Sequence, residues 1–125
     1  MQKNYCNMKL NEYQQKAMST CMESCENFAY MSYGLVGELG ELMGNIAKHI
    51  RKGNMVLQDN GLKVTDEFTK EDAEALLAEL GDCQWFIAGL AHVLGQDLED
   101  ICQANLNKLA SRKERGVIDG NGDNR

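Results

Sequence analysis

The sequence contains no proline, only 6% aromatic residues, and no apolar run that approaches the length of a membrane span. Proline breaks helices, so its absence beside abundant Leu, Ala, Glu and Lys favours long uninterrupted helices over a β-sandwich. A spanning helix needs about 20 consecutive apolar residues. We therefore expect a helical protein with no segment that crosses a membrane.

An excess of positive charge is also missing, because the net charge is −6 at pH 7. This argues against a nucleic-acid-binding surface and restricts any anion site to a local group of Lys and Arg. The five cysteines are an odd number with no secretion signal ahead of them, which favours free thiols and a cytoplasmic location. At 125 residues we expect a single domain over residues 1–125, with flexible tails at 1–8 and 117–125.

Apolar periodicity predicts four amphipathic helices, and we expect an all-α, four-helix bundle-like fold. Residues 53–68 lack a helical period; they are expected to form a loop with a short hairpin about Asp59-Asn60-Gly61. Three helices are expected to begin with capping pairs, namely Asn11 with Gln14, Thr69 with Asp72, and Asp97 with Asp100. The four helices are expected at 11–31, 34–51, 70–94 and 98–115.

Polar side chains recur beside the apolar stripe of three of these helices, at spacings of three and four residues that keep them on one face. Because the angular offset from the apolar stripe is the same each time, we expect the three polar stripes to converge on one cleft. They are Glu38, Glu41, Asn45 and Lys48; Glu79, Asp82, Phe86 and Gly89; and Asn105, Lys108, Arg112 and Arg115.

Convergence would gather four carboxylates, which repel one another unless a cation lies between them. An all-oxygen set without histidine suits Mg²⁺ or Mn²⁺ rather than Zn²⁺. Lys and Arg beside it are residue types that bind phosphate. The alternative is that the acids are ordinary solvated helix faces. Five glycines around them argue against that alternative, because glycine is costly in a helix unless something approaches closely: Gly34, Gly37, Gly40, Gly44 and Gly81.

Other kinds of site are disfavoured. A di-iron centre uses Glu-x-x-His, but Ile46 and Gly89 stand three residues before His49 and His92. The sequence has neither a P-loop motif nor a Gly-x-Gly-x-x-Gly motif, so it does not support the corresponding nucleotide sites.

Segments 37–42 (Gly-Glu-Leu-Gly-Glu-Leu) and 79–82 (Glu-Leu-Gly-Asp) together resemble the Glu-x-x-Glu and Glu-x-x-Asp signature of the MazG-like all-α nucleoside triphosphate pyrophosphohydrolases. The resemblance continues through 105–109, 112–116 and the terminal 122–125. One departure is the separation of 37 residues between Glu41 and Glu79, longer than is usual in the family, which we attribute to an insertion at 53–68.

The resemblance implies Mg²⁺-dependent hydrolysis of a (deoxy)nucleoside triphosphate to monophosphate and pyrophosphate, with Mn²⁺ as a possible substitute. It also implies a homodimer or homotetramer whose neighbouring subunits complete the site, with a free face near Met22, Tyr30 and Trp85. The terminal segment is expected to order over bound nucleotide, with Asp123 or Arg125 near the phosphates. The alternatives are a phosphoribosyl-ATP pyrophosphohydrolase and a non-catalytic helical bundle that binds a nucleotide or a partner.

The site residues that the resemblance implies fall into three roles. Glu38 or Glu41 would orient or deprotonate the attacking water. The metal ligands would be Glu38, Glu41, Glu79 and Asp82, and the substrate-binding residues would be Lys48, Asn105, Lys108, Arg112 and Arg115.

Overall fold

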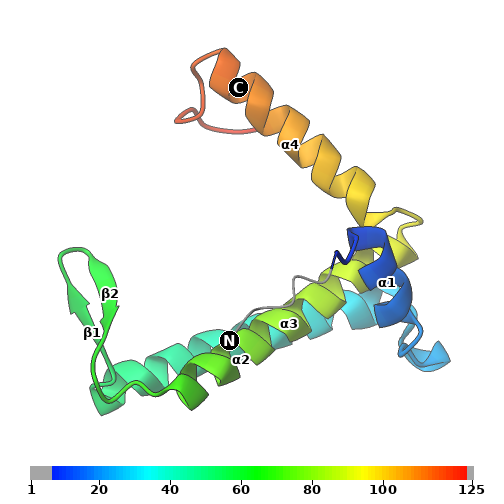
Figure 1. Cartoon of the computed structure of the whole chain (residues 1–125). Helices are drawn as coiled ribbons and strands as arrows, with labels where there is room; N and C mark the ends of the chain where they lie inside the picture. Colours follow the sequence, from blue (N-terminus) through cyan, green and yellow to red (C-terminus); the bar gives the residue numbers. More distant parts are fainter. Residues whose placement is uncertain (1–6, 124–125) are drawn as a thin grey trace.

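The computed structural model describes residues 7–123, and over this range the chain is all-α apart from one small hairpin (Figure 1). A single 3₁₀ turn, η1 (Glu23–Cys25), lies between the first two helices. The helical class and the number of helices agree with the prediction. In chain order the elements are α1 (Leu10–Met18), α2 (Phe28–Lys52), β1 (Met55–Gln58), β2 (Gly61–Val64), α3 (Lys70–Val93) and α4 (Leu98–Glu114).

The predicted first helix over 11–31 is wrong, because α1 ends at Met18 and α2 already begins at Phe28. Hydroxyl groups end α1: Ser19 Oγ and Thr20 Oγ1 donate hydrogen bonds to carbonyls one turn back, at 2.5 and 2.6 Å. Asn27 then caps α2, since its side-chain oxygen accepts a hydrogen bond from the backbone N–H of Tyr30 at 2.8 Å. Helix α2 is therefore longer than predicted and starts before the first glycine.

The other boundaries follow the local signals. Helix α2 ends at Gly53, whose φ of 79° places it in the left-handed region. The hairpin turn has Asp59 and Asn60 at φ 52° and 61°, as a tight two-residue turn requires. Thr69 and Asp72 form both hydrogen bonds of the predicted capping box of α3.

The two long helices, α2 and α3, pack against each other as an antiparallel pair, and the other elements attach at its two ends (Figure 1). Helix α1 lies on α3, and α4 meets α1 near its own N-terminus. The hairpin joins the opposite end of the pair and contacts α2 through β1. Helix α4 and the hairpin project from the pair on the same side in Figure 1, so the chain has the outline of a C.

Two glycines permit the close approach of α2 and α3. A Cβ at Gly34 would lie 2.0 Å from the Phe86 ring, and one at Gly89 would lie 2.2 Å from the sulfur of the fully buried Met31. The sequence predicted close contact at Gly34. At the other four predicted glycines a Cβ would meet nothing within 4 Å in this chain: Gly37, Gly40, Gly44 and Gly81.

Side chains of α1, not the residues predicted from the sequence, cap α4. Gln14 Oε1 accepts a hydrogen bond from the N–H of Leu98 at 3.0 Å, and Asn11 Oδ1 accepts one from the N–H of Glu99 at 3.0 Å. Asp97 occupies the cap position without a side-chain hydrogen bond. The predicted capping roles of Asn11 and Asp97 are therefore wrong, because tertiary contacts satisfy the first amides of α4.

The chain buries little of its apolar surface. Its accessible surface is 9546 Å², whereas a compact monomer of this mass exposes about 6,700 Å². On α4 the apolar stripe is buried at Leu98, whereas Ile101, Leu106 and Leu109 are exposed, because α2 and α3 do not pack along this helix among the described residues. Apolar residues at core spacing also remain exposed on α2, α3 and α4, as well as Leu94 just after α3: Leu39, Ile50, Leu80, Ile87, Leu94, Ile101, Leu106 and Leu109. Among residues 7–123, no helix is both long and apolar enough to cross a membrane.

Candidate metal and phosphate site

Three carboxylates come together where α2 and α3 pack. Glu38 and Glu41 lie one turn apart on α2, and Glu79 reaches them from α3. Each offers a carboxylate oxygen within 4.8 Å of the others. Glu38 and Glu79 are half-buried, while Glu41 is exposed. The structure thus joins two of the three polar stripes into one acidic cluster, defined by Glu38, Glu41 and Glu79.

The acidic cluster is electrostatically unsatisfied. Oxygen Oε2 of Glu38 and Oε2 of Glu79 are buried and have no hydrogen-bond partner. Burial raises the pKa of Glu38, and the neighbouring carboxylates of Glu41, Asp82 and Glu79 raise it further. A cation placed among these oxygens would offset the cost of burying them and the repulsion between the carboxylates. The donor set therefore fits a hard divalent ion.

Two other polar residues adjoin the cluster. Asn45, one turn beyond Glu41, donates a hydrogen bond from Nδ2 to Glu79 Oε1 at 3.4 Å and so fixes how Glu79 presents its other oxygen. Sequence spacing placed Asn45 on the same stripe but gave no reason for this contact across helices. Asp82 is exposed and is not one of the three grouped carboxylates, although its charge raises the pKa values of Glu38 and Tyr13.

The third polar stripe does not reach the acidic cluster in the same chain, so the predicted convergence of all three stripes is wrong within one copy. The reason is that α4 is anchored only near its N-terminus and projects away from α2 and α3 (Figure 1). Asn105 and Lys108 border an open hollow of about 380 Å³ on α4. Arg115 donates from Nε to Ser111 Oγ at 3.1 Å, and Lys48 is exposed on α2, two turns beyond Glu41.

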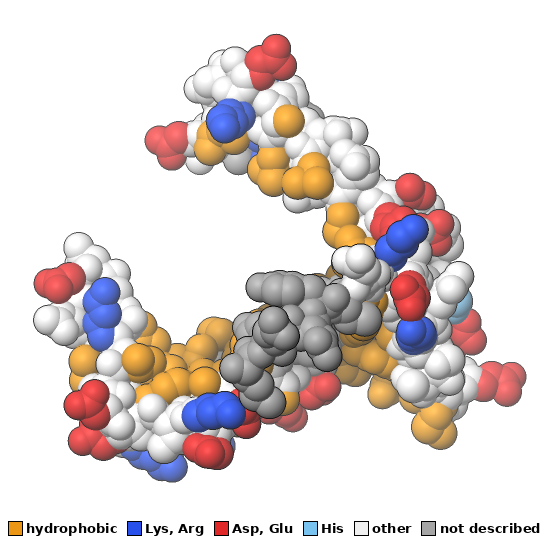
Figure 2. Space-filling view, in the orientation of Figure 1, with side chains coloured by type: hydrophobic (Ala, Val, Ile, Leu, Met, Phe, Trp, Pro, Cys, Tyr) orange, Lys and Arg blue, Asp and Glu red, His pale blue; other side chains and the backbone are white. Residues whose placement is uncertain are grey.

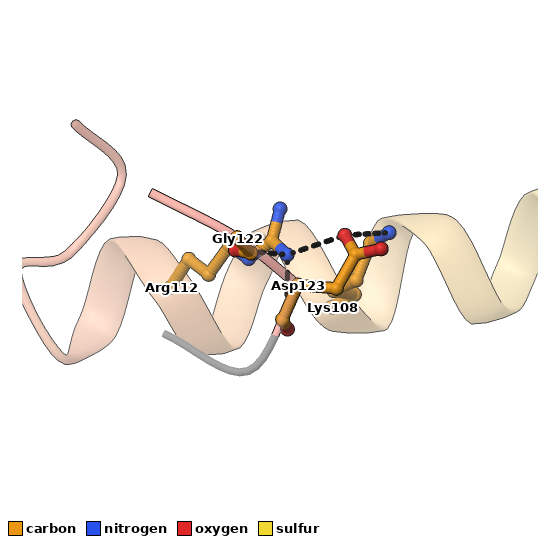
Figure 3. Close-up of polar contacts among 4 residues, drawn as sticks. All are labelled: Lys108, Arg112, Gly122 and Asp123. Carbon is orange, nitrogen blue, oxygen red and sulfur yellow. Dashed lines mark hydrogen bonds and ion pairs between the residues drawn. The ribbon is translucent and has the colours of Figure 1, made fainter. Parts of the chain in front are cut away.

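The C-terminal segment folds back onto the basic residues of α4 (Figure 3). Arg112 Nη2 donates to Asp123 Oδ1 and to the Asp123 carbonyl, each at 3.1 Å, and Lys108 Nζ lies 3.4 Å from the same carboxylate. Arg112 is only 5% exposed, and it lowers the pKa of Asp123 below its ordinary value, as Lys108 also does. Two predicted phosphate ligands thus share one carboxylate. Arg125, the other tail residue that we singled out, lies outside the described residues.

A larger hollow of about 580 Å³ contains no residue of the acidic cluster and is lined by α1, the end of α3 and the connection before α4. Gln14 lines it, but its side chain is fully used: Nε2 donates to the carbonyls of Ala88 and Gln96, and Oε1 accepts from Leu98. The polar groups of Gln14 are therefore occupied within the chain and are not available to a ligand in this hollow.

Comparison with known proteins assigns the family. A model of the MazG nucleotide pyrophosphohydrolase domain matches residues 26–117. The chain belongs to the MazG family. The matched range holds the acidic cluster and all of α4, and the family-level activity is that of a nucleotide pyrophosphohydrolase, a hydrolase.

A curated relative of this MazG chain is the Gene 37 protein of Mycobacterium phage L5. It is 44% identical over 103 residues, which cover 82% of this chain and 81% of the relative. No solved structure matches the chain.

Proposed function

We propose that this MazG chain hydrolyses a (deoxy)nucleoside triphosphate to the monophosphate and pyrophosphate, with Mg²⁺ as cofactor and Mn²⁺ as a substitute. The observation that carries the proposal is the pair of buried, partnerless carboxylate oxygens on Glu38 and Glu79, inside the range that matches the family. Buried charges without partners are costly and are kept where a ligand completes them.

Glu38, Glu41 and Glu79 would hold the ion, with Asp82 as the fourth carboxylate at the rim. When bound, Mg²⁺ supplies positive charge against the triphosphate and acidifies the attacking water. Glu38 or Glu41 then orients that water and accepts its proton as the oxygen attacks the α-phosphorus. The bond from the α-phosphorus to the bridging oxygen breaks, and pyrophosphate leaves. Asn45 keeps Glu79 in position during this step.

Lys48, Asn105, Lys108, Arg112 and Arg115 would bind the triphosphate. Because α4 extends away from the acidic cluster of its own chain, its basic residues would serve the site of a second copy in a homodimer, or in a homotetramer built from two dimers. The accessible surface supports association: it exceeds that of a compact monomer by about 2,800 Å². Obligate dimer interfaces bury surface on this scale.

Product analysis tests the reaction. The purified protein is incubated with Mg²⁺ and a panel of NTPs, dNTPs and phosphoribosyl-ATP, and we expect monophosphate and pyrophosphate from at least one. Glu38→Gln keeps the shape but removes the charge, and should lower the rate about 100-fold or more. Glu23→Gln, at an exposed position in η1, is the matched control and should retain activity. Diphosphate with orthophosphate, or full activity in Glu38→Gln, would contradict the proposal.

Asp123 provides a second test, of the phosphate-binding role of α4. Its exposed carboxylate lies on Lys108 and Arg112 and must give way when phosphates bind the same groups. Asp123→Asn should therefore lower the KM for the triphosphate by about two- to fivefold at low ionic strength, and less at high salt, because exposed ion pairs are weak and screened. An increased KM would mean that Asp123 orients these residues for the substrate.

A further inference from the structure

The hairpin carries an apolar face that the chain covers only in part. Opposite residues of the two strands share a face, so Met55 and Val64 lie on the same side as Leu57 and Leu62. Met55 is buried at the end of the hairpin where β1 contacts α2, whereas Leu57 is 77% and Val64 61% exposed. The hairpin face is thus a strip that starts in the core and continues into solvent.

Helix α4 repeats this arrangement at the other end of the chain. Its apolar stripe starts at the buried Leu98 and continues through Ile101 and Leu106 to Leu109, all exposed. Figure 2 shows hydrophobic side chains on the side of α4 that faces the hairpin and others around the base of the hairpin. The exposed stripe of α4 therefore borders the open gap on one side, and hydrophobic side chains at the base of the hairpin border it on the other.

One chain cannot close this gap itself. The hairpin precedes the first residue of α3 and α4 follows its last, and the 24 residues of α3 span about 36 Å. A second copy turned by a two-fold axis through the gap exchanges the two ends. Each hairpin then meets the α4 of the other copy, in two equivalent contacts, as the symmetry of a closed dimer requires.

The distribution of charge also favours a second copy of this chain as the partner. The turn after the hairpin and the first turns of α3 are mainly acidic, while the second half of α4 is mainly basic, so a hairpin end that receives a partner's α4 brings opposite charges together. The acidic residues are Asp66, Glu67, Glu71, Asp72 and Glu74, and the exposed basic residues are Lys108, Lys113 and Arg115.

We propose that the hairpin of residues 55–64 is a clasp that holds α4 of a second copy of this chain through Leu57, Leu62 and Val64. The inference rests on the homodimer proposed above and names the surface that forms it. It gives the inserted segment a role, since the clasp would hold the basic residues of α4 beside the carboxylates of the other copy.

The test measures association by sedimentation velocity without nucleotide. Leu57→Lys and Leu106→Asp should each weaken the dimer about tenfold or more, because each buries a charge in an apolar contact. Gln58→Lys is the matched control: it adds the same charge one residue along the strand, on the opposite face, and should leave association unchanged. Circular dichroism should show unaltered helix content, since all three side chains are exposed.

The double variant Leu57→Lys with Leu106→Asp tests direct contact. Opposite charges that meet in one interface should recover part of the lost association. The association constant of the double variant should therefore be about fivefold higher than the two separate losses predict when combined. Purely additive losses, or wild-type association of Leu57→Lys, would overturn the clasp. An active hydrolase that dimerises without the hairpin would refute the clasp alone, and a clasped dimer without activity would refute only the proposed reaction.

Discussion

Gly34 determines how closely α2 approaches α3, one turn before Glu38. The ring that occupies its missing side chain belongs to Phe86, which is buried and packs against Tyr30 and Trp85 at ring-centre distances of 5.8 and 5.0 Å. With rings on both sides, Phe86 has little room to move. The spacing of the two helices, and so the separation of Glu38 from Glu79, depends on glycine at this position.

Gly34→Ala should destabilise the protein by about 1–2 kcal/mol net, because overpacking the core costs about 2–3 kcal/mol at so close a contact. This cost exceeds the gain of about 1 kcal/mol that alanine gives in a helix. Urea unfolding measures the change. The double variant Gly34→Ala with Phe86→Leu is the control and should be more stable than the two separate losses predict, because the smaller side chain makes room for the new methyl group. An equal or higher stability of Gly34→Ala would show that the helices separate without cost.

Among single residues, the sequence predicted best what lies within one helix. Glu38 and Glu41 share a face because three residues are nearly one helical turn, whatever else the chain does. Glu79 joins them only through the packing of α2 on α3, which the matching stripes and Gly34 suggested. The contact of Arg112 with Asp123 depends on how a glycine-rich segment turns back, and helical periodicity carries no information about that.

At the scale of elements, α4 is held by Gln14 and Asn11 of α1, whose side chains accept hydrogen bonds from the N–H groups of Leu98 and Glu99. Gln14 is 6% exposed, and all its hydrogen bonds go to backbone groups: one to the first amide of α4 and two to carbonyls of α3 and of the connection before α4. Two side chains that are 84 and 88 residues away in sequence therefore orient the start of α4.

Gln14→Leu should lower the free energy of unfolding by about 2–4 kcal/mol, because it leaves buried donors and acceptors unpaired. Asp97→Ala is the matched control at the same helix end. Since Asp97 makes no capping hydrogen bond, its loss should change stability by less than about 0.5 kcal/mol. Thermal and urea unfolding of both variants measure the two losses of stability. A larger loss in Asp97→Ala than in Gln14→Leu would mean that Asp97 caps α4, as the sequence predicted.

Element ends were predictable where a residue acts on its own backbone, as at Gly53, Thr69 and the Asp59-Asn60 turn. Two helix ends were not predicted. At Ser19 and Thr20, side-chain hydroxyl groups bond to the backbone and end α1, and at Leu98 the side chain of Gln14 replaces the local cap of α4. The same apolar spacing that continues past Met18 gave no sign of the break, because periodicity reports burial and not the continuity of a helix.

For the whole molecule, the apolar stripes identified the faces that need cover but not what covers them. In α4, Leu106 and Leu109 have the spacing of core residues, yet within one chain they face an open gap. A bundle that closes on itself and one that closes on a second copy have the same periodicity, so the sequence pattern alone cannot separate them. The exposed area favours closure on a second copy, as proposed above, since it exceeds the surface of a compact monomer of this mass.

A chain that completes its apolar burial by association must become more stable as its concentration rises. For a folded dimer that dissociates on unfolding, a tenfold increase in concentration adds about 1.4 kcal/mol per dimer. This corresponds to a rise in Tm of about 2–5 °C. Calorimetry from 1 to 100 µM, in buffer with EDTA and without nucleotide, isolates this effect from ligand binding. The Tm of the wild type should rise by this amount for each tenfold step in concentration. Leu57→Lys should have a lower Tm at every concentration, because more of its chains lack a partner. A Tm that stays constant over this range would mean that the chain is stable as a monomer, and that its exposed leucines do not bind a second copy.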